Sequence, residues 1–437
     1  MTTAIPARAL PGPMREHLTG VDRRMGEAAS ARPRQRLVVV GNGMAGMRTV
    51  EELLKLDASV YDITVFGAEP HGNYNRILLS PLLAGEKRLD DIMLHPHAWY
   101  AANGITLHAG DPIVAIDRTR RIVISRSGRK AAYDRLLLAT GSRPFVIPVP
   151  GADLPGVVAF RAIEDVEAML TAARTRRKAV VIGGGLLGLE AAHGLKRRGM
   201  DVTVVHVMDR LMERQLDAPA AALLREALER RGIRVLLKAD TAAILGRDRV
   251  AGLRFKDGRE IEADLVVMAV GIRPNVELAR QAGLYCERAI VVDDTLQTLS
   301  DPRIYAVGEC VQHRKATFGL VAPIWEQARV CAAHLAGYGH RRFVQTATAT
   351  QLKVSGIDVF SAGEFGGGDG TEDLVFRDAR RGTYKRLVLK DGCLVGAVLY
   401  GDVGDGAWYF ELMRRRADVS RLRSRLVFGR AFCADAP

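Results

Sequence analysis

The sequence is poor in cysteine, and its five cysteines among 437 residues are scattered. No C-x-x-C or C-x-x-x-x-C spacing occurs, so the chain gives no support to a redox dithiol, a zinc site or an iron–sulfur site. A proline splits the pair His95 and His97, with Asp91 nearby, so we expect no metal there either. Free cysteines without a disulfide framework are typical of a reducing compartment, and we expect a cytoplasmic protein.

Long hydrophobic runs are also missing. No segment reaches the roughly 18 uninterrupted apolar residues of a membrane span, and we expect no membrane partner. The longest candidate, residues 179–195, holds five glycines and two ionisable side chains, and it predicts a strand, a turn and a helix instead. No secretory signal follows Met1. Residues 1–35, rich in Pro, Ala and Arg, predict a disordered extension.

Acidic residues are outnumbered by basic ones, and the net charge is +13. A basic surface can attract nucleic acid, an anionic membrane or an acidic protein. No nucleic-acid motif is present and the arginines are spread along the chain, which excludes nucleic acid as the expected partner. An acidic redox partner and a merely solubilising charge both remain open.

Glycine is plentiful, with 44 residues, and it marks the stretch around which the chain is organised. Residues 37–46 read L-V-V-V-G-N-G-M-A-G, a strand that runs into G-x-G-x-x-G and then a helical pattern. Gly41 permits the turn, Gly43 lets backbone approach a pyrophosphate, and Gly46 allows close packing of helix on strand. A second strand over 63–66 leads to Glu69, near the expected place for a ribose-binding acid.

A second strand–turn–helix begins at Lys178 and carries Gly183, Gly185 and Gly188 in the same spacing. Its helix is followed by the strand 201–205, so the context of a dinucleotide site is complete again. Because each fingerprint needs its own dinucleotide, we expect the chain to bind two. After this second strand stands His206 rather than an acid, which removes the usual discrimination against NADP. Arg210 or Arg214 could bind a 2′-phosphate, so NADH and NADPH both remain open.

Each G-x-G-x-x-G motif is followed, further along the chain, by a strand that ends in a glycine-containing turn. We call these two turns the glycine exits. Residues 133–144 end in A-T-G-S-R-P, and residues 264–275 repeat the plan with A-V-G-I-R-P-N. Further on, a strand over 304–307 ends in Gly308 and Glu309, whose carboxylate could meet a ribityl hydroxyl or serve only as a helix-start acid. From about residue 343 the composition changes to short strands, followed by a predicted Arg-rich helix over 408–426.

These motifs together resemble the pyridine nucleotide–disulfide oxidoreductase superfamily, in the branch without a dithiol. Within it, the chain looks most like the flavin-containing N-terminal part of the NAD(P)H nitrite reductase large subunit, on residues 74–86, 204–206, 211–217, 306–310, 319–323 and 359–364. Rubredoxin and ferredoxin reductases are the next closest group. The resemblance implies an α/β fold with two Rossmann-like domains and a small C-terminal α+β domain. We expect an FAD domain over 36–150 and 286–342, an NAD(P)H domain over 151–285, and an interface domain over 343–437.

The resemblance also implies which residues hold the cofactors FAD and NAD(P)H. For FAD they are Gly41, Gly43, Met44, Ala45, Gly46, Glu69, Arg76, Ser80, Ala139, Thr140, Gly141, Gly308, Glu309, Pro323 and Trp325. For NAD(P) they are Gly183, Gly185, Leu186, Leu187, Gly188, Glu190, His206, Arg210 and Gly271, with Glu190 toward the nicotinamide. Rubredoxin reductases carry a lysine where this chain has Pro81, so a Lys–Glu pair beside the flavin lacks its lysine, and Glu164 is not assigned that role.

The predicted activity is oxidation of NAD(P)H with onward electron transfer through FAD, in nitrite or nitrate assimilation. The sequence lacks the Cys-rich module and sirohaem domain of a full nitrite reductase subunit, so we expect the acceptor on another chain: an iron–sulfur, sirohaem or molybdenum protein. A homodimer is possible. A rubredoxin or ferredoxin reductase feeding an oxygenase, and a flavoprotein that acts as a sensor or interaction subunit, are the alternatives.

Overall fold

The computed structural model describes residues 34–433, so the predicted extension lies almost wholly outside the described residues. The first large sheet joins two distant stretches of the chain, because its centre is built from strands of both. Strands β22, β9, β1, β2 and β5 are parallel, and the apolar run 37–40 of β1 is buried among them. In sheet order the strands are β24 (Ala316–Thr317), β23 (Val311–His313), β20 (Ile290–Val292), β21 (Gln297–Thr298), β22 (Asp301–Ala306), β9 (Arg135–Leu138), β1 (Gln35–Val40), β2 (Tyr61–Phe66) and β5 (Thr106–His108).

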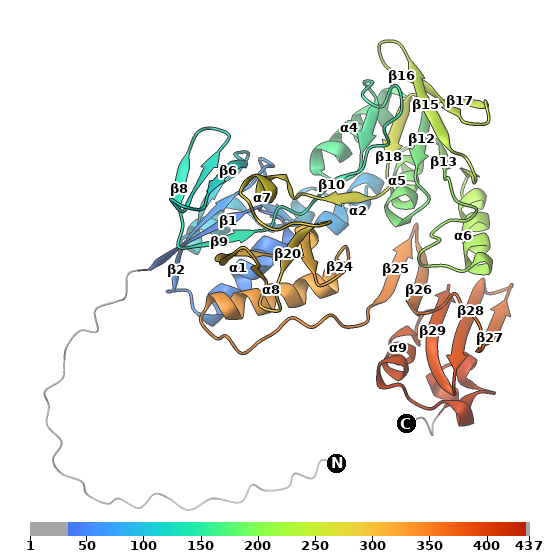
Figure 1. The fold of residues 1–437 in the computed structure, drawn as a ribbon. Coiled ribbons are helices and arrows are strands. Elements are labelled where there is room, and N and C mark those ends of the chain that lie inside the picture. Colours follow the sequence, from blue (N-terminus) through green and yellow to red (C-terminus); the bar gives the residue numbers. More distant parts are fainter. Residues whose placement is uncertain (1–33, 434–437) are drawn as a thin grey trace, which may run out of the picture. The chain divides into compact units, whose positions relative to one another are not determined.

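The second sheet repeats the plan of the first with five parallel strands. Such a sheet is covered on both faces, which is why its strands read as apolar runs in the sequence. A small antiparallel sheet of β15 (Thr241–Gly246), β16 (Val250–Phe255) and β17 (Glu260–Glu262) lies beside it (Figure 1). In order, the parallel strands are β11 (Val157–Ala159), β18 (Leu265–Met268), β12 (Lys178–Ile182), β13 (Asp201–Val205) and β14 (Ile233–Leu236).

Helices follow the strands as the sequence predicts. Helices α1 (Met44–Leu56) and α5 (Leu186–Arg197) each begin directly after a glycine turn. Helix α8 (Val321–Leu335) packs along α1, so a late segment completes the first sheet's helical cover. The other helices outside the C-terminal sheet are α2 (Leu79–Ala84), α3 (His97–Ala102), α4 (Ile163–Thr175), α6 (Ala218–Arg230) and α7 (Glu277–Gln281).

The two glycine exits of the sequence pair with each other. Strand β10 (Ser142–Pro144) runs antiparallel to β19 (Ile272–Pro274), with Arg143 opposite Arg273. The repeat seen in the sequence is therefore also a structural joint between the units built on the first and second sheets. The remaining short strands are β3 (Asn73–Tyr74), β4 (Met93–His95), β6 (Ile113–Asp117), β7 (Ile122–Ser125) and β8 (Lys130–Ala132).

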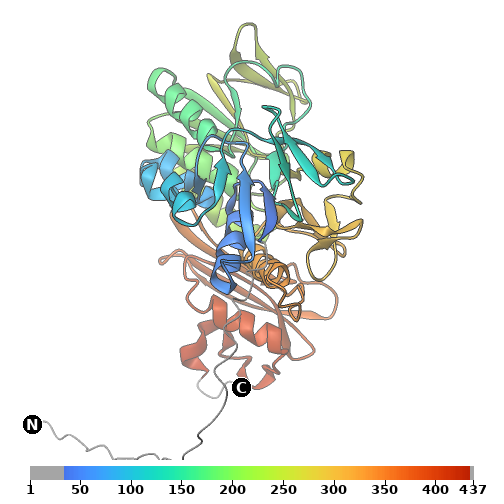
Figure 2. The same cartoon turned by 90° about the vertical axis from the view of Figure 1, so that its left-hand side faces the viewer.

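A third sheet, wholly antiparallel, forms the C-terminal part of the described chain, and α9 (Gly406–Arg415) packs on one of its faces (Figures 1 and 2). The predicted helix over 408–426 is wrong in its second half. Arg416 adopts a left-handed conformation, and the amide of Ala417 donates to the carbonyl of Leu412, which closes α9. Short 3₁₀ turns follow. The strands are β25 (Ala349–Val354), β26 (Ile357–Gly363), β29 (Cys393–Tyr400), β28 (Thr383–Lys390) and β27 (Thr371–Asp378).

The short helix α2 fastens the units built on the first and second sheets together by packing on α5. Gly194 leaves a notch for Leu83, because a Cβ at residue 194 would lie 2.7 Å from the Leu83 Cγ. Arg198, just beyond α5, donates from Nε to the carbonyl oxygen of Leu83 at 2.7 Å. The hydroxyl of Ser80 donates to the Glu190 carboxylate at 2.5 Å. We call these contacts the α2–α5 seam.

Over residues 34–433 no helix has the length and apolarity to cross a membrane. In the same range no group of three or more His, Cys, Asp or Glu side chains is arranged to hold a metal ion.

The notch at Gly194 gives a test of the seam. A glycine-to-alanine change inside a helix normally stabilises by up to about 1 kcal/mol. We expect Gly194→Ala to lower the melting temperature instead, because its methyl group overpacks against Leu83, at a cost of about 1–3 kcal/mol. Differential scanning fluorimetry measures the change.

Leu83→Ala provides the control, since it empties the space that the new methyl group needs. The double variant is expected to be no less stable than Leu83→Ala alone. If the two losses simply add, Gly194 does not contact α2 in the way described.

Candidate functional site

The first glycine turn is held so closely that only glycine fits. Gly41 has a φ of +114°, and a Cβ there would overlap the carbonyl oxygen of Ala139 at the end of β9. A Cβ on Gly46 would lie 2.8 Å from the Gly41 carbonyl oxygen. Gly43 differs, because a Cβ built on it meets no atom within 4 Å. Two glycines thus close the turn, and the third faces open space.

The second turn repeats this arrangement residue for residue. Gly183 has a φ of +124°, and its Cβ would overlap the carbonyl oxygen of Ala269 at the end of β18. A Cβ on Gly188 would overlap the Gly183 carbonyl oxygen, whereas one on Gly185 meets nothing within 4 Å. The equivalence shows that the two glycine turns have the same construction. We call each glycine turn, together with the helix N-terminus that follows it, a cradle.

Both cradles open onto a free helix N-terminus. Gly43 and Gly185 are the N-caps of α1 and α5, and neither helix has a side-chain cap or an acid in its first turn. The first amide N–H groups of each helix therefore lack a side-chain acceptor, and the helix dipole adds a partial positive charge. An anion such as a pyrophosphate satisfies both requirements.

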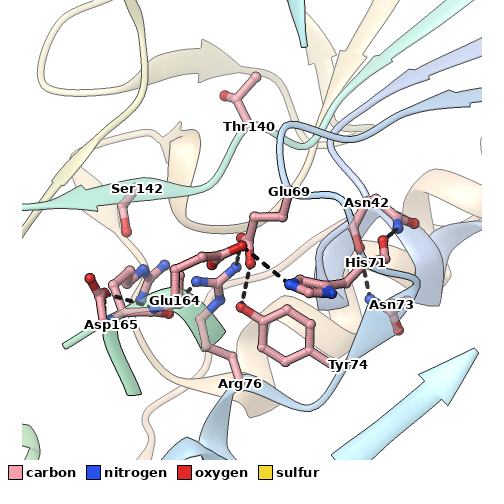
Figure 3. Close-up of polar contacts among 12 residues, drawn as sticks. Asn42, Glu69, His71, Asn73, Tyr74, Arg76, Thr140, Ser142, Glu164 and Asp165 are labelled. Carbon is pink, nitrogen blue, oxygen red and sulfur yellow. Dashed lines mark hydrogen bonds and ion pairs between the residues drawn. The ribbon is translucent and has the colours of Figure 1, made fainter. Parts of the chain in front are cut away.

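Beyond the first turn, Glu69 lies in a polar cluster (Figure 3). Its two carboxylate oxygens accept hydrogen bonds from the Tyr74 hydroxyl and from Arg76 Nη2, both at 2.7 Å. The Arg76 guanidinium stacks over the Tyr74 ring at 5.2 Å and also donates to the carbonyl oxygen of Arg161. The structure thus brings Glu69 and Arg76 together as an ion pair.

A second ion pair lies in the same cluster and joins the two units. Glu309 contacts Arg161 and accepts a 2.6 Å hydrogen bond from the Ser142 hydroxyl. Arg161 precedes α4 and is held by Asp165, whose carboxylate accepts from the Arg161 amide at 2.6 Å. Arg161 Nε is buried without a hydrogen-bonding partner. Sequence reasoning missed Arg161 because no motif surrounds it.

Asn42, inside the first glycine motif, organises the surrounding loop and was also missed. Its side chain donates to the carbonyl oxygen of His71 at 3.1 Å and accepts from the Tyr100 hydroxyl at 2.6 Å. The backbone carbonyl oxygen of Asn42 accepts a hydrogen bond from Nδ2 of Asn73 at 2.9 Å. His71 Nε2 in turn lies 3.2 Å from Glu164, the residue that the absent lysine leaves without a predicted role (Figure 3).

Gly308 and helix α8, which come late in the chain, pack against the first cradle. Gly308 packs on the first turn of α1, since a Cβ there would lie 2.8 Å from Ala45 Cβ. Its amide donates to Oε1 of Gln327 on α8 at 2.8 Å, while the Gln327 Nε2 is buried and unpartnered. Trp325, also on α8, lies under the Arg48 guanidinium at 5.6 Å. The unpaired amide of Gln327 fits a site that receives a hydrogen-bond acceptor.

The two exits are pinned to each other beside this cradle. Thr140 donates its hydroxyl hydrogen to the Asn275 carbonyl oxygen at 2.9 Å, and Asn275 Nδ2 donates to the Thr140 carbonyl oxygen at 2.8 Å. The Asn275 amide donates to Gly141, and the Phe145 amide donates to Gly271. Thr140 therefore serves the joint between the units.

At the second cradle His206 packs beneath the glycine turn. The Gly184 amide donates to His206 Nδ1 at 3.1 Å, and His206 Nε2 lies 3.1 Å from a carboxylate oxygen of Glu213. Arg210 contacts its neighbour Asp209. Both ring nitrogens of His206 are thus engaged within the chain. Glu213, which sequence reasoning did not single out, is the acid that contacts His206.

Glu190 occupies the α2–α5 seam, where it accepts the hydrogen bond from Ser80. Burial raises the pKa of its carboxyl, and the hydrogen bond from Ser80 works in the opposite direction. Four further residues predicted to bind a cofactor lie in the first turns of helices. Met44 stands in the first turn of α1, Leu186 and Leu187 in the first turn of α5, and Pro323 in the first turn of α8.

The sequence and the structure were compared with those of known proteins. A family model described as pyridine nucleotide-disulphide oxidoreductase matches residues 35–336. A second model, described as the rubredoxin NAD+ reductase C-terminal domain, matches residues 349–417.

Among similar proteins, a nitrite reductase [NAD(P)H] of Bacillus subtilis (strain 168) is 50% identical over 387 residues, covering 89% of this chain and 48% of that protein. An assimilatory nitrate reductase electron transfer subunit of the same organism is 45% identical, covering 90% and 51%. The chain therefore spans about half the length of these curated relatives. A ferredoxin reductase structure from Rhodopseudomonas palustris aligns with a TM-score of 0.82 and 28% identity, over 92% of this chain and all of that one (100%).

The open face of Gly185 predicts a clean loss of nucleotide binding. Gly185→Val should fold normally, because a Cβ at this position meets no protein atom within 4 Å, and should abolish NAD(P)H binding by filling the space in front of α5. Fluorescence titration with NADH measures binding, and the absorbance of retained FAD reports the first site.

Gly368→Val is the matched control, since Gly368 also faces open space but lies in a C-terminal loop. It should leave both cofactors bound. Undiminished NADH binding by Gly185→Val would contradict the assignment of the second cradle.

Proposed function

We propose that this chain, which belongs to the pyridine nucleotide-disulphide oxidoreductase family, oxidises NAD(P)H and passes the electrons through FAD to a separate redox protein. Membership of the family confirms the superfamily recognised from the sequence, the fold class, the oxidoreductase class and the two cofactors, FAD and NAD(P)H. The sequence provides no dithiol, so the electrons leave the flavin for an acceptor that is not a disulfide of this chain.

The observation that carries the proposal is the pair of matching cradles. Each has two glycines locked against a neighbouring strand and one glycine that faces open space before an uncapped helix. Both would bind a dinucleotide pyrophosphate through amide N–H groups. The α2–α5 seam and the β10–β19 pair fix the two cradles relative to each other.

In the first cradle we assign Gly41, Gly43 and Gly46, with Met44 and Ala45, to the pyrophosphate of FAD. Glu69 would accept from the ribose hydroxyls and Arg76 would face phosphate. The two residues now form an ion pair, so each already has its charge balanced before a ligand arrives. Gln327 and Arg161 contribute buried, unpaired N–H groups that an acceptor atom would satisfy.

A bound FAD would supply the chemistry of two-electron uptake from NAD(P)H and one-electron release to an acceptor. The chain's own residues bind and orient. Gly183, Gly185 and Gly188 would hold the pyrophosphate of the nicotinamide nucleotide, and Glu190 would lie toward its nicotinamide end. Because the Ser80 hydroxyl holds Glu190 at the seam, that end of the nucleotide would be positioned against the first unit.

We infer three functional units: an FAD domain over 36–150 and 286–342, an NAD(P)H domain over 151–285, and an interface domain over 343–437. The strand pairing supports the first, because β22 of the later stretch pairs with β9 of the earlier one. Contacts of Asp217 with Tyr384 at 2.6 Å tie the third unit to the second.

For the acceptor we propose an iron–sulfur, sirohaem or molybdenum protein of nitrite or nitrate assimilation. The names of the two Bacillus subtilis relatives, a nitrite reductase and an electron transfer subunit of nitrate reductase, support this. The net charge of +13 favours an acidic partner surface. We place the reaction in the cytoplasm, where NAD(P)H is available.

A rubredoxin or ferredoxin reductase is the second candidate function. The match of residues 349–417 to the rubredoxin reductase C-terminal model and the likeness to a ferredoxin reductase favour it. Both candidates share the reductive half-reaction and differ only in the protein that accepts the electrons.

Anaerobic stopped-flow spectroscopy tests the proposal. Mixing the FAD-loaded protein with NADH or NADPH should bleach the flavin absorbance within the millisecond-to-second range, and one class of iron–sulfur or haem protein should then restore it. Reoxidation by a nitrite or nitrate reductase module supports the first candidate, and reoxidation by rubredoxin or ferredoxin the second. Failure of both nucleotides to bleach the flavin would sink both enzyme functions and leave a sensor or interaction subunit.

A further inference from the structure

The second cradle has an acidic side chain nearby that does not lie at the end of its second strand. In dinucleotide-binding units an acidic residue at the end of the second strand accepts the 2′-hydroxyl of the adenosine ribose. Here β13 ends at Val205, and the next residue is His206. The strand end therefore supplies an imidazole at the place of the usual carboxylate.

The imidazole is used to hold a carboxylate at that place. Because the Gly184 amide donates to Nδ1, the ring proton lies on Nε2, which faces the Glu213 oxygen at 3.1 Å. Glu213 thus stands one imidazole ring away from the glycine turn. Within the described part of the chain His206 is its hydrogen-bonding partner, and its side chain is 25% exposed, so it also faces solvent.

The loop that carries Glu213 is clamped onto the same turn. The amide of Met212 donates to the Gly184 carbonyl oxygen at 3.0 Å, and Leu211 and Met212 are buried. Met212 has a φ of +50°, a left-handed conformation that costs energy in a residue with a side chain. This fixed backbone directs the next residue, Glu213, toward His206.

The neighbouring residues fit an adenosine. Val207 and Met208, which follow His206 directly, are 56% and 44% exposed. These side chains offer an apolar surface that a purine ring would cover. The charge of the nearby Arg210 is partly balanced by Asp209, whose carboxylate lies 3.2 Å from the Arg210 Nη1.

We propose that Glu213, positioned by His206, accepts the adenosine 2′-hydroxyl and makes this chain select NADH over NADPH. The proposal rests on the proposed function, because it assigns the second cradle to the nicotinamide nucleotide. A carboxylate at this point accepts a hydrogen bond from the 2′-hydroxyl of NAD and repels the 2′-phosphate of NADP. Glu213 is the specificity-determining residue and His206 is a positioning residue.

Isothermal titration calorimetry with NAD+ and NADP+ on the FAD-loaded protein tests this without turnover. The unaltered protein should bind NAD+ at least about tenfold more tightly than NADP+. Glu213→Gln should weaken NAD+ binding by about tenfold, since a hydrogen bond to a charged group is lost, and should remove most of the discrimination against NADP+.

Asp201→Asn is the matched control, because it removes an exposed acid at the opposite end of β13, away from His206 and Arg210. It should leave the ratio of the two dissociation constants within about twofold. His206→Asn keeps an acceptor for the Gly184 amide but releases Glu213, and should lose part of the selectivity. Combined with Glu213→Gln it should add little further loss.

Tighter binding of NADP+ by the unaltered protein, an unchanged ratio in Glu213→Gln, or an equal change in Asp201→Asn would overturn the proposal. These results leave the proposed function standing, since a nucleotide still binds. If neither nucleotide binds and neither reduces the flavin, the proposed function itself fails.

Discussion

The position of the two cradles relative to each other depends on the packing of α2 against α5. The first cradle lies on one sheet and the second on another, and a hydride passes only between groups held in contact. Leu83 fits the notch that Gly194 leaves, Arg198 binds the end of α2, and Ser80 binds Glu190. Since α5 is also the helix whose N-terminus faces the second cradle, this seam sets the position of one nucleotide site directly against the unit that forms the other.

The two cradles show how much of the function is local in the sequence. A G-x-G-x-x-G motif between a strand and a helix was sufficient to predict both turns, because each glycine answers a constraint within a few residues or on one neighbouring strand. Gly41 and Gly183 meet Ala139 and Ala269 in the same way. The repeated exits were also visible, although their antiparallel pairing was not.

The contacts that join distant segments around the first cradle were harder to predict. Arg161 meets Glu309 across 148 positions of sequence, and Gln327 reaches Gly308 only because α8 packs along α1. Such contacts follow from tertiary packing and have no local signature. The place of His206 after β13 predicts a contact with the nucleotide, but it does not show that the two ring nitrogens bind Gly184 and Glu213. The Arg-rich C-terminal segment was read as one helix because composition does not show where Arg416 turns left-handed.

We propose that one chain binds two dinucleotides at once, one in each cradle. Bound FAD can be measured by absorbance while the same sample is titrated with NAD+ in a calorimeter. We expect one FAD and one NAD+ per chain, with all of the FAD retained at saturation. Release of FAD in proportion to the NAD+ bound would show that the two nucleotides compete for a single site and would contradict binding in two separate cradles.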